Sequence, residues 1–186
     1  MIFPANFVLF VYQMNTGSHF SGGAVLSLES ESKNDAIKEL IRRAPAFTHI
    51  GNRTRLEKAV IERENIQSTA CGHGIAFAHG KTDQVDDVAI VLGISKKGIR
   101  FSAPDGGPVH LLFVIASPPS DHRHYLMVLS SLARICYDRR FIREVIDKLS
   151  LKDIEKKLSK KLNQNLNRYQ RKMCGLRGGY ETASAI

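Results

Sequence analysis

Tryptophan is absent from this sequence, and its three cysteines, Cys71, Cys136 and Cys174, lie far apart in a chain of 186 residues. An odd number of widely spaced cysteines builds neither a disulfide framework nor a zinc ribbon, which needs paired Cys-x-x-Cys motifs. These absences exclude a small disulfide-stabilised scaffold. They favour a reducing cytoplasm as the location of the protein.

A long hydrophobic run is also missing. The most apolar stretch, IFPANFVLFVY at residues 2–12, contains Pro4 and is too short to span a bilayer, which takes about 20 residues. A secretory signal would have a basic residue before the apolar stretch, and this sequence has none there. We expect residues 1–23 to form an N-terminal extension, an extra strand or a loosely attached segment, with a loop at 16–23. A translation start at Met14 is an alternative, and membrane insertion is not expected.

Positive charge is present in excess but unevenly. The net charge is +9, and residues 151–186 carry nine Lys and Arg against three Asp and Glu, which is +6 and leaves +3 for residues 1–150. We expect a basic amphipathic helix at 151–172 and a flexible tail at 173–186. The charge fits a solvated helix face or a surface for an acidic partner. No aromatic platform or recognition motif accompanies it, so nucleic acid is not an expected partner.

Hydrophobic periodicity in the first half of the chain predicts a strand at 24–28 followed by two helices. The first helix has Ser32 as its N-cap, and the second runs from a cap at Thr54 to about Glu64. Ser, Thr, Asn and Asp are the residues that best accept hydrogen bonds from the first amides of a helix.

The middle of the chain predicts buried strands. Continuous apolar runs at 87–95 and 109–117 are typical of strands covered on both faces. The segment 96–101 between them predicts a hairpin turn and a short strand, and 103–108 predicts a turn. Buried strands need helices on both sides, so we expect a three-layer α/β/α sandwich.

Three helical patterns follow. Their predicted caps are Ser120 or Asp121, then Asp138, then Ser150 in a capping box. The apolar positions at helical spacing, which we expect to face inward, include Leu126, Leu129, Leu132, Ala133, Cys136, Leu151, Ile154, Leu158, Leu162, Leu166 and Tyr169.

Two histidines stand in the small-residue stretch STACGHGIAFAHG at residues 68–80. A neutral imidazole is a good nucleophile near pH 7. The glycines permit close backbone approach and unusual dihedral angles, and the alternating GIAFA predicts a short strand that holds His79. We therefore expect the glycine-rich loop to expose His79.

The stretch RENIQSTACGHGIAFAHGK at residues 63–81 resembles the signature of the mannitol/fructose-type enzyme IIA of the bacterial phosphoenolpyruvate–sugar phosphotransferase system (PTS). That family shows Arg-Glu, then Ser-Thr, then Gly-x-Gly-Ile-Ala-x-Pro-His-Gly. A second match is SPPSDHRHYLMVLSSLA at 117–133, and the helix SKNDAIKEL and the strand VHLLFVIA also correspond. The resemblance implies a type-2 EIIA domain at 24–150 with a mixed central β-sheet between helices.

The resemblance also implies roles for three residues. His79 matches the histidine that accepts a phosphoryl group from HPr or an HPr-like carrier, His124 matches the second active-site histidine, and Arg63 matches the arginine near the site. A phosphoryl group in flight is stabilised by positive charge and donors, which these side chains supply. No metal or cofactor is implied. Ala78 stands where the family usually has proline, which would stiffen the backbone before the histidine.

Alternatives to these roles remain open. His122 competes with His124 for the second position. His73 is expected to be structural, and a metal site made of His73, His79 and His124, with Cys71 as a fourth ligand, is disfavoured because no acidic ligand joins them.

The function has alternatives too. The absence of a fused IIB or IIC domain favours a nitrogen-regulatory IIA that binds target proteins according to its phosphorylation state. A sugar-specific IIA that passes phosphate to a IIB cysteine is the alternative, and a non-catalytic binding module is a further one.

Overall fold

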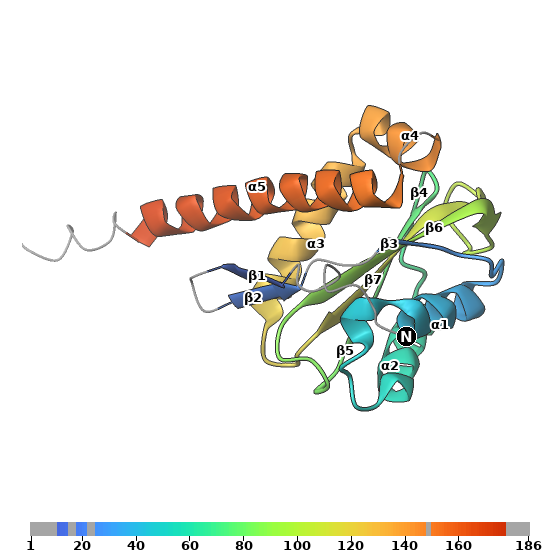
Figure 1. The fold of residues 1–186 in the computed structure, drawn as a ribbon, viewed down its shortest axis with the longest axis horizontal. Helices are drawn as coiled ribbons and strands as arrows, with labels where there is room; N and C mark the ends of the chain where they lie inside the picture. Colours follow the sequence, from blue (N-terminus) through green and yellow to red (C-terminus); the bar gives the residue numbers. More distant parts are fainter. Residues whose placement is uncertain (1–10, 15–17, 22–24, 148–149, 178–186) are drawn as a thin grey trace, which may run out of the picture. The chain divides into compact units, whose positions relative to one another are not determined.

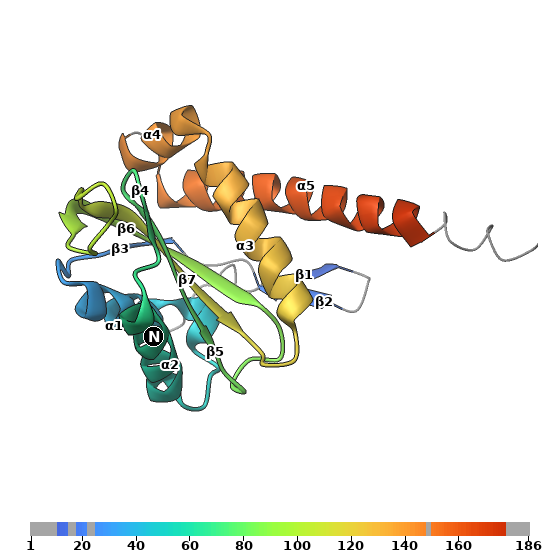
Figure 2. The same cartoon turned by 180° about the vertical axis from the view of Figure 1, so that it is seen from behind.

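The computed structural model describes residues 11–14, 18–21, 25–147 and 150–177. The chain forms two compact units, Met1–His122 and Arg123–Ile186. The first holds the β-sheet with two helices, and the second holds the helices that follow (Figures 1 and 2). Among the described helices, none has both the length and the apolarity needed to cross a membrane.

The sheet of the first unit is mixed, as expected. Among the described residues it contains seven strands in the order β1-β2-β6-β7-β5-β4, with β3 also paired to β6. The β1–β2, β6–β7 and β4–β5 pairs are antiparallel, and the β2–β6, β3–β6 and β5–β7 pairs are parallel. The strands are β1 Val11–Met14, β2 Ser18–Ser21, β3 Val25–Ser27, β4 Ala70–Gly72, β5 Ile75–Lys81, β6 Ala89–Ile99 and β7 Val109–Ser117.

Strand β7 confirms the expected buried strand at 109–117, because every residue in it except His110 is buried. Of the hairpin turn and short strand expected at 96–101, the turn is wrong, since β6 continues as one strand to Ile99. Its register with β7 jumps from Ile94↔Leu111 to Ile99↔Val109, which leaves extra residues in a bulge. Gly98 has a φ of +88° there, a conformation that glycine adopts without strain.

Helix α1, Lys33–Arg43, and helix α2, Arg53–Ile66, are joined through the short 3₁₀ helix Pro45–Phe47 and pack on one face of the sheet. The Ser32 hydroxyl accepts from the amide of Asp35, so the predicted cap of α1 is confirmed. The predicted cap of α2 is wrong. Asn52 takes that position instead of Thr54, with its side chain accepting from the amide of Arg55 at 3.2 Å, and it starts the helix two residues earlier.

Three helices follow the sheet: α3, His122–Cys136, α4, Arg139–Asp147, and α5, Leu151–Arg177. All of their described residues except His122 belong to the second unit. Two of the three predicted caps are confirmed: Asp138 accepts from the amide of Phe141 at 3.1 Å, and Ser150 accepts from the amide of Asp153 at 3.2 Å. The cap expected for α3 at Ser120 or Asp121 stays a prediction. The ion pairs Lys157–Glu144 and Lys161–Asp138 between α5 and the α4 region add to the apolar packing of the buried residues on these helices.

The burial of some apolar helix positions, and the ends of some segments, differ from the prediction. Leu126 and Leu151 are 54% and 42% exposed, and Ala133 is exposed, whereas the α5 stripe at Ile154, Leu158, Leu162 and Leu166 is buried. Helix α5 continues to Arg177, beyond the expected end at 172, and the rest of the expected tail, 178–186, lies outside the described residues. The loop expected at 16–23 instead contains β2, and the extension at 1–10 lies outside the described residues.

Candidate active site

His79 is the fifth residue of β5 and pairs with Ile115 of the parallel neighbour β7. On the other side of β5, β4 pairs only with Ile75 and Ala76. Within the described residues, His79 therefore has a strand partner on one side only. The side chain is half-buried, so it is partly accessible while its backbone is fixed by the ladder with β7.

The glycine that follows His79 allows helix α2 to lie against β5 (Figures 1 and 2). A Cβ placed on Gly80 would lie 2.9 Å from both the amide nitrogen and the Cγ2 of Val60, and 3.1 Å from the carbonyl carbon of Ala59. The two distances of 2.9 Å are shorter than a Cβ atom adopts in proteins, so only glycine permits this approach. The approach brings the last turn of α2, with Arg63, to the part of β5 that carries His79.

A hydrogen bond fixes the proton on the imidazole of His79. Its Nδ1 lies 2.9 Å from the backbone oxygen of Phe77. A carbonyl oxygen can only accept, so Nδ1 carries the hydrogen and donates it. The lone pair of the neutral ring is consequently on Nε2, and Nε2 is the nucleophilic atom.

The surroundings of His79 favour its neutral form. Burial lowers the pKa of the imidazole below its usual 6.5, and the positive charge of Arg63 lowers it further. The hydrogen bond to Phe77 and the negative charge of Glu64 act in the opposite direction, but the net shift is downward. At neutral pH the ring therefore keeps the lone pair that a nucleophile needs.

Arg63 and Glu64 are adjacent on α2 but differ in their environment. The guanidinium of Arg63 donates to the backbone oxygen of Gln67 at 3.1 Å, which holds it at the C-terminal end of the helix. Glu64 is 1% exposed. Its carboxylate accepts from the amide and the hydroxyl of Thr69 and lies 3.6 Å from Nζ of Lys33. The buried charge is thus both hydrogen-bonded and paired.

Sequence reasoning missed the role of Glu64 and Thr69. The signal was present in the Arg-Glu and Ser-Thr pairs of the family signature, but a glutamate on a helix is ordinarily solvent-exposed. In the fold, Glu64 connects the start of α1, the end of α2 and the entry to β4. It therefore fixes the corner of the chain that positions Arg63.

The glycine-rich segment does not expose His79, contrary to expectation. Gly72, His73 and Gly74 form the turn between β4 and β5, at the opposite end of β5 from His79. Their φ angles are +79°, +56° and +77°, and the amide of His73 donates to the carboxylate of Asp105 at 2.6 Å. These glycines serve a tight turn because it needs left-handed backbone.

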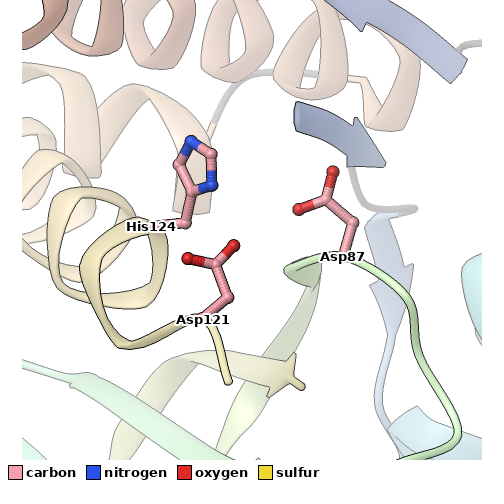
Figure 3. A group of neighbouring side chains, drawn as sticks. All are labelled: Asp87, Asp121 and His124. Carbon is pink, nitrogen blue, oxygen red and sulfur yellow. The ribbon is translucent and has the colours of Figure 1, made fainter. Parts of the chain in front are cut away.

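His124 is the third residue of α3 and belongs to the second unit. Its position in the first turn of the helix agrees with the expectation. Figure 3 labels it together with Asp87 and Asp121 of the first unit. These two aspartates have carboxylate oxygens within 4.8 Å of each other, and sequence reasoning did not single them out. Acidic pairs of this kind are common in proteins without an ion, so we assign no metal to them.

A half-buried neutral histidine with one ring nitrogen fixed as donor, beside an arginine, is a site suited to accept an anionic group. Residues 21–161 match the family described as phosphoenolpyruvate-dependent sugar phosphotransferase system, EIIA 2. The chain belongs to this family of phosphotransferases, which relay phosphate through a histidine.

Relatives with two kinds of names align with the chain. The fructose-specific EIIABC component of the PTS of Bacillus subtilis is 31% identical over 122 residues, which cover 66% of this chain but only 19% of that protein. A nitrogen regulatory protein of Bradyrhizobium diazoefficiens is 30% identical over 113 residues, covering 61% of this chain and 73% of that protein. The family membership supports a phosphocarrier role, but these names do not decide between sugar transport and regulation.

Solved structures agree with the predicted fold. The nitrogen regulatory protein IIA-Ntr of Neisseria meningitidis superposes with a TM-score of 0.62 at 25% identity, covering 73% of this chain and 93% of that one. The mannitol IIA of Escherichia coli gives 0.56 at 20% identity, covering 76% and 94%. The predicted α/β sandwich of the mannitol-type enzyme IIA fold is therefore confirmed.

The electrostatics of His79 give a first prediction. We expect its pKa in the unphosphorylated protein to lie below 6.5, and Arg63→Gln to move it upward because a nearby positive charge is removed. The imidazole resonances of His79, followed by NMR against pH, measure both values. A wild-type pKa at or above 6.5, or a downward shift in Arg63→Gln, would contradict the electrostatic account.

Proposed function

We propose that this chain is a phosphocarrier in which Nε2 of His79 accepts a phosphoryl group from a phosphohistidine of HPr or an HPr-like carrier. The observation that carries the proposal is the Nδ1–H hydrogen bond to Phe77, which leaves the lone pair on Nε2. In the transfer, the N–P bond of the donor breaks as the bond between phosphorus and Nε2 forms. The proton on Nδ1 remains on the ring, where the Phe77 carbonyl stabilises the charge that develops.

Arg63 is proposed to stabilise the equatorial oxygens of the phosphoryl group in flight. Its planar guanidinium stays charged at all working pH values and can donate to two oxygens at once. His124 is proposed as a further donor from the first turn of α3, where a helix dipole favours an anion. Because donor and acceptor are both imidazoles, the step requires no metal ion or cofactor.

Alanine in place of the family's proline is compatible with this role. The methyl group of Ala78 is fully buried in the core beneath α1 and α2. The backbone on both sides of His79 is held by β7 through the pairs Ala78↔Val114 and Gly80↔Ala116. The ladder supplies the rigidity that proline would otherwise give, which argues against the non-catalytic binding module.

For the fate of the phosphoryl group, we favour a nitrogen-regulatory type that binds target proteins according to its phosphorylation state. The similarity to the Bradyrhizobium and Neisseria proteins supports this choice.

The second candidate is a sugar-specific IIA that donates to a IIB cysteine, supported by the Bacillus relative. The proposed organisation keeps the EIIA domain at 24–150, and the cysteine usage supports a cytoplasmic location.

Phosphorylation tests the proposal. Incubation with phosphoenolpyruvate, enzyme I and HPr is expected to add one phosphoryl group, about 80 Da by intact mass at neutral to alkaline pH, that acid removes, because phosphohistidine is acid-labile. A gain that survives acid, or none with a cognate HPr, would refute the carrier role.

Adding a IIB protein from the same genome then separates the two types. We expect the phosphoryl group to stay on this chain. Quantitative transfer to the IIB cysteine would instead establish the sugar-specific type.

A further inference from the structure

The second unit carries a groove that the proposed function does not use. Its volume is about 330 Å³, and it lies along α5 with one wall from α3. The two helices meet there, since the amide of Asn165 donates to the backbone oxygen of Ser131 at 3.5 Å. The residues that line the groove are Arg134, Asn165, Arg168, Tyr169 and Arg171. We call this surface the arginine groove.

Positive charge in the arginine groove is not compensated within the described part of the chain. Arg134, Arg168 and Arg171 are exposed, and no described carboxylate forms an ion pair with any of them. Earlier on α5 the situation is different. Lys157 pairs with Glu144 at 2.9 Å, and Lys161 pairs with Asp138 at 3.0 Å. Lys156 and Lys160 of α5 are likewise exposed and form no ion pair with a described carboxylate, but they lie outside the groove. What distinguishes the groove is that three arginines without a described ion pair line one hollow.

The chemistry of the walls defines the kind of partner. Three guanidinium groups offer planar pairs of donors, which match carboxylates in a two-point geometry. Between them, the methylene stems of the arginines and the ring of Tyr169 provide apolar surface. A segment with both carboxylates and apolar side chains complements such a surface.

We propose that the arginine groove docks an acidic amphipathic segment of a partner protein. The chain's own C-terminal segment does not fit, because residues 172–186 carry two basic residues and one acidic residue. A single-stranded nucleic acid would need a row of aromatic side chains for stacking, whereas this groove has one tyrosine. The inference rests on the second unit alone and does not depend on phosphorylation of His79.

The test uses the full chain and a short fluorescein-labelled peptide in which glutamates and leucines alternate at helical spacing. Fluorescence anisotropy measures its affinity, with a peptide that has glutamine for every glutamate as the reference. The double variant Arg134→Ala/Arg168→Ala is expected to bind the acidic peptide roughly tenfold more weakly. The control Lys156→Ala/Lys160→Ala removes the same charge from exposed positions of α5 outside the groove and is expected to change the affinity less than about twofold.

Three results would overturn the proposal. Equal losses in both double variants would mean that diffuse charge, not the groove, attracts the peptide. Equal affinity for the glutamine peptide would remove the role of carboxylates. Tighter binding of a labelled single-stranded DNA, lost in the same arginine variant, would assign the groove to nucleic acid. Thermal unfolding of each variant, with Arg134→Gln/Arg168→Gln as a second pair, separates lost binding from lost folding.

Discussion

His79→Ala is expected to abolish phosphoryl uptake from phosphorylated HPr completely. The substitution removes Nε2, the only nucleophile that the hydrogen bond to Phe77 prepares at this site. An alanine methyl group offers no lone pair, so the variant has no atom at this position that can accept the phosphoryl group. We therefore expect no uptake at all, not a slower one. Intact-mass measurement over time, with phosphoenolpyruvate, enzyme I and HPr, follows the reaction directly.

The matched control is His49→Ala, which removes an exposed histidine of the first unit and is expected to leave uptake unchanged. Arg63→Ala and His124→Ala are expected to slow uptake, Arg63→Ala by roughly a hundredfold, without abolishing it, because they are proposed to stabilise the group in flight. Histidine phosphorylation that persists in His79→Ala would show that another histidine is the acceptor.

Gly80→Ala is expected to have the largest effect on stability, lowering the free energy of unfolding by about 2 kcal/mol. The new methyl group would lie 2.9 Å from the backbone of Val60, so α2 must move away from β5. Because Arg63 lies one turn further along α2, the same shift is expected to slow phosphoryl uptake. Chemical denaturation measures the first effect and the mass assay measures the second.

Gly51→Ala provides the comparison for this variant. A Cβ at Gly51 meets only the side chain of Gln84, at 3.6 Å, which is an ordinary contact. We expect a change within about 0.5 kcal/mol and unchanged uptake. If Gly80→Ala were as stable and as active as Gly51→Ala, close packing of α2 on β5 would have no part in forming the site.

The fold was predictable where one physical cause dominates a segment. A continuous apolar run gives a strand buried on both faces, and β7 follows that rule. Ser32, Asp138 and Ser150 cap helices because their short side chains reach the free amides without help from the rest of the fold. Such features depend on neighbours in the sequence and are readable from it.

Features that depend on distant contacts were not predictable. The bulge at Gly98 is a feature of the pairing of β6 with β7, whose register shifts between Ile94 and Ile99, and periodicity alone suggested a turn there. The Gly72–Gly74 turn depends on Asp105, thirty-two residues from His73. Both involve residues with positive φ angles. The reason for these angles is visible only in the folded structure, where β7 and Asp105 lie next to them.

The candidate site shows the same division. His79 and Arg63 were singled out because their spacing resembles a known signature, and the fold places both on neighbouring elements of one unit. Burial of Glu64 was missed because its counter-charge, Lys33, comes from the start of α1, thirty-one residues away. Without a partner charge, a glutamate side chain is expected to be exposed to solvent.

The most direct test of the central claim is the position of the phosphoryl group on the ring of His79. NMR of ¹⁵N-labelled, phosphorylated protein distinguishes the two ring nitrogens. The account predicts phosphorus bonded to Nε2, with Nδ1 still protonated and hydrogen-bonded to Phe77. Phosphorus on Nδ1 would contradict it, because that atom could react only after giving up the hydrogen bond that defines the site.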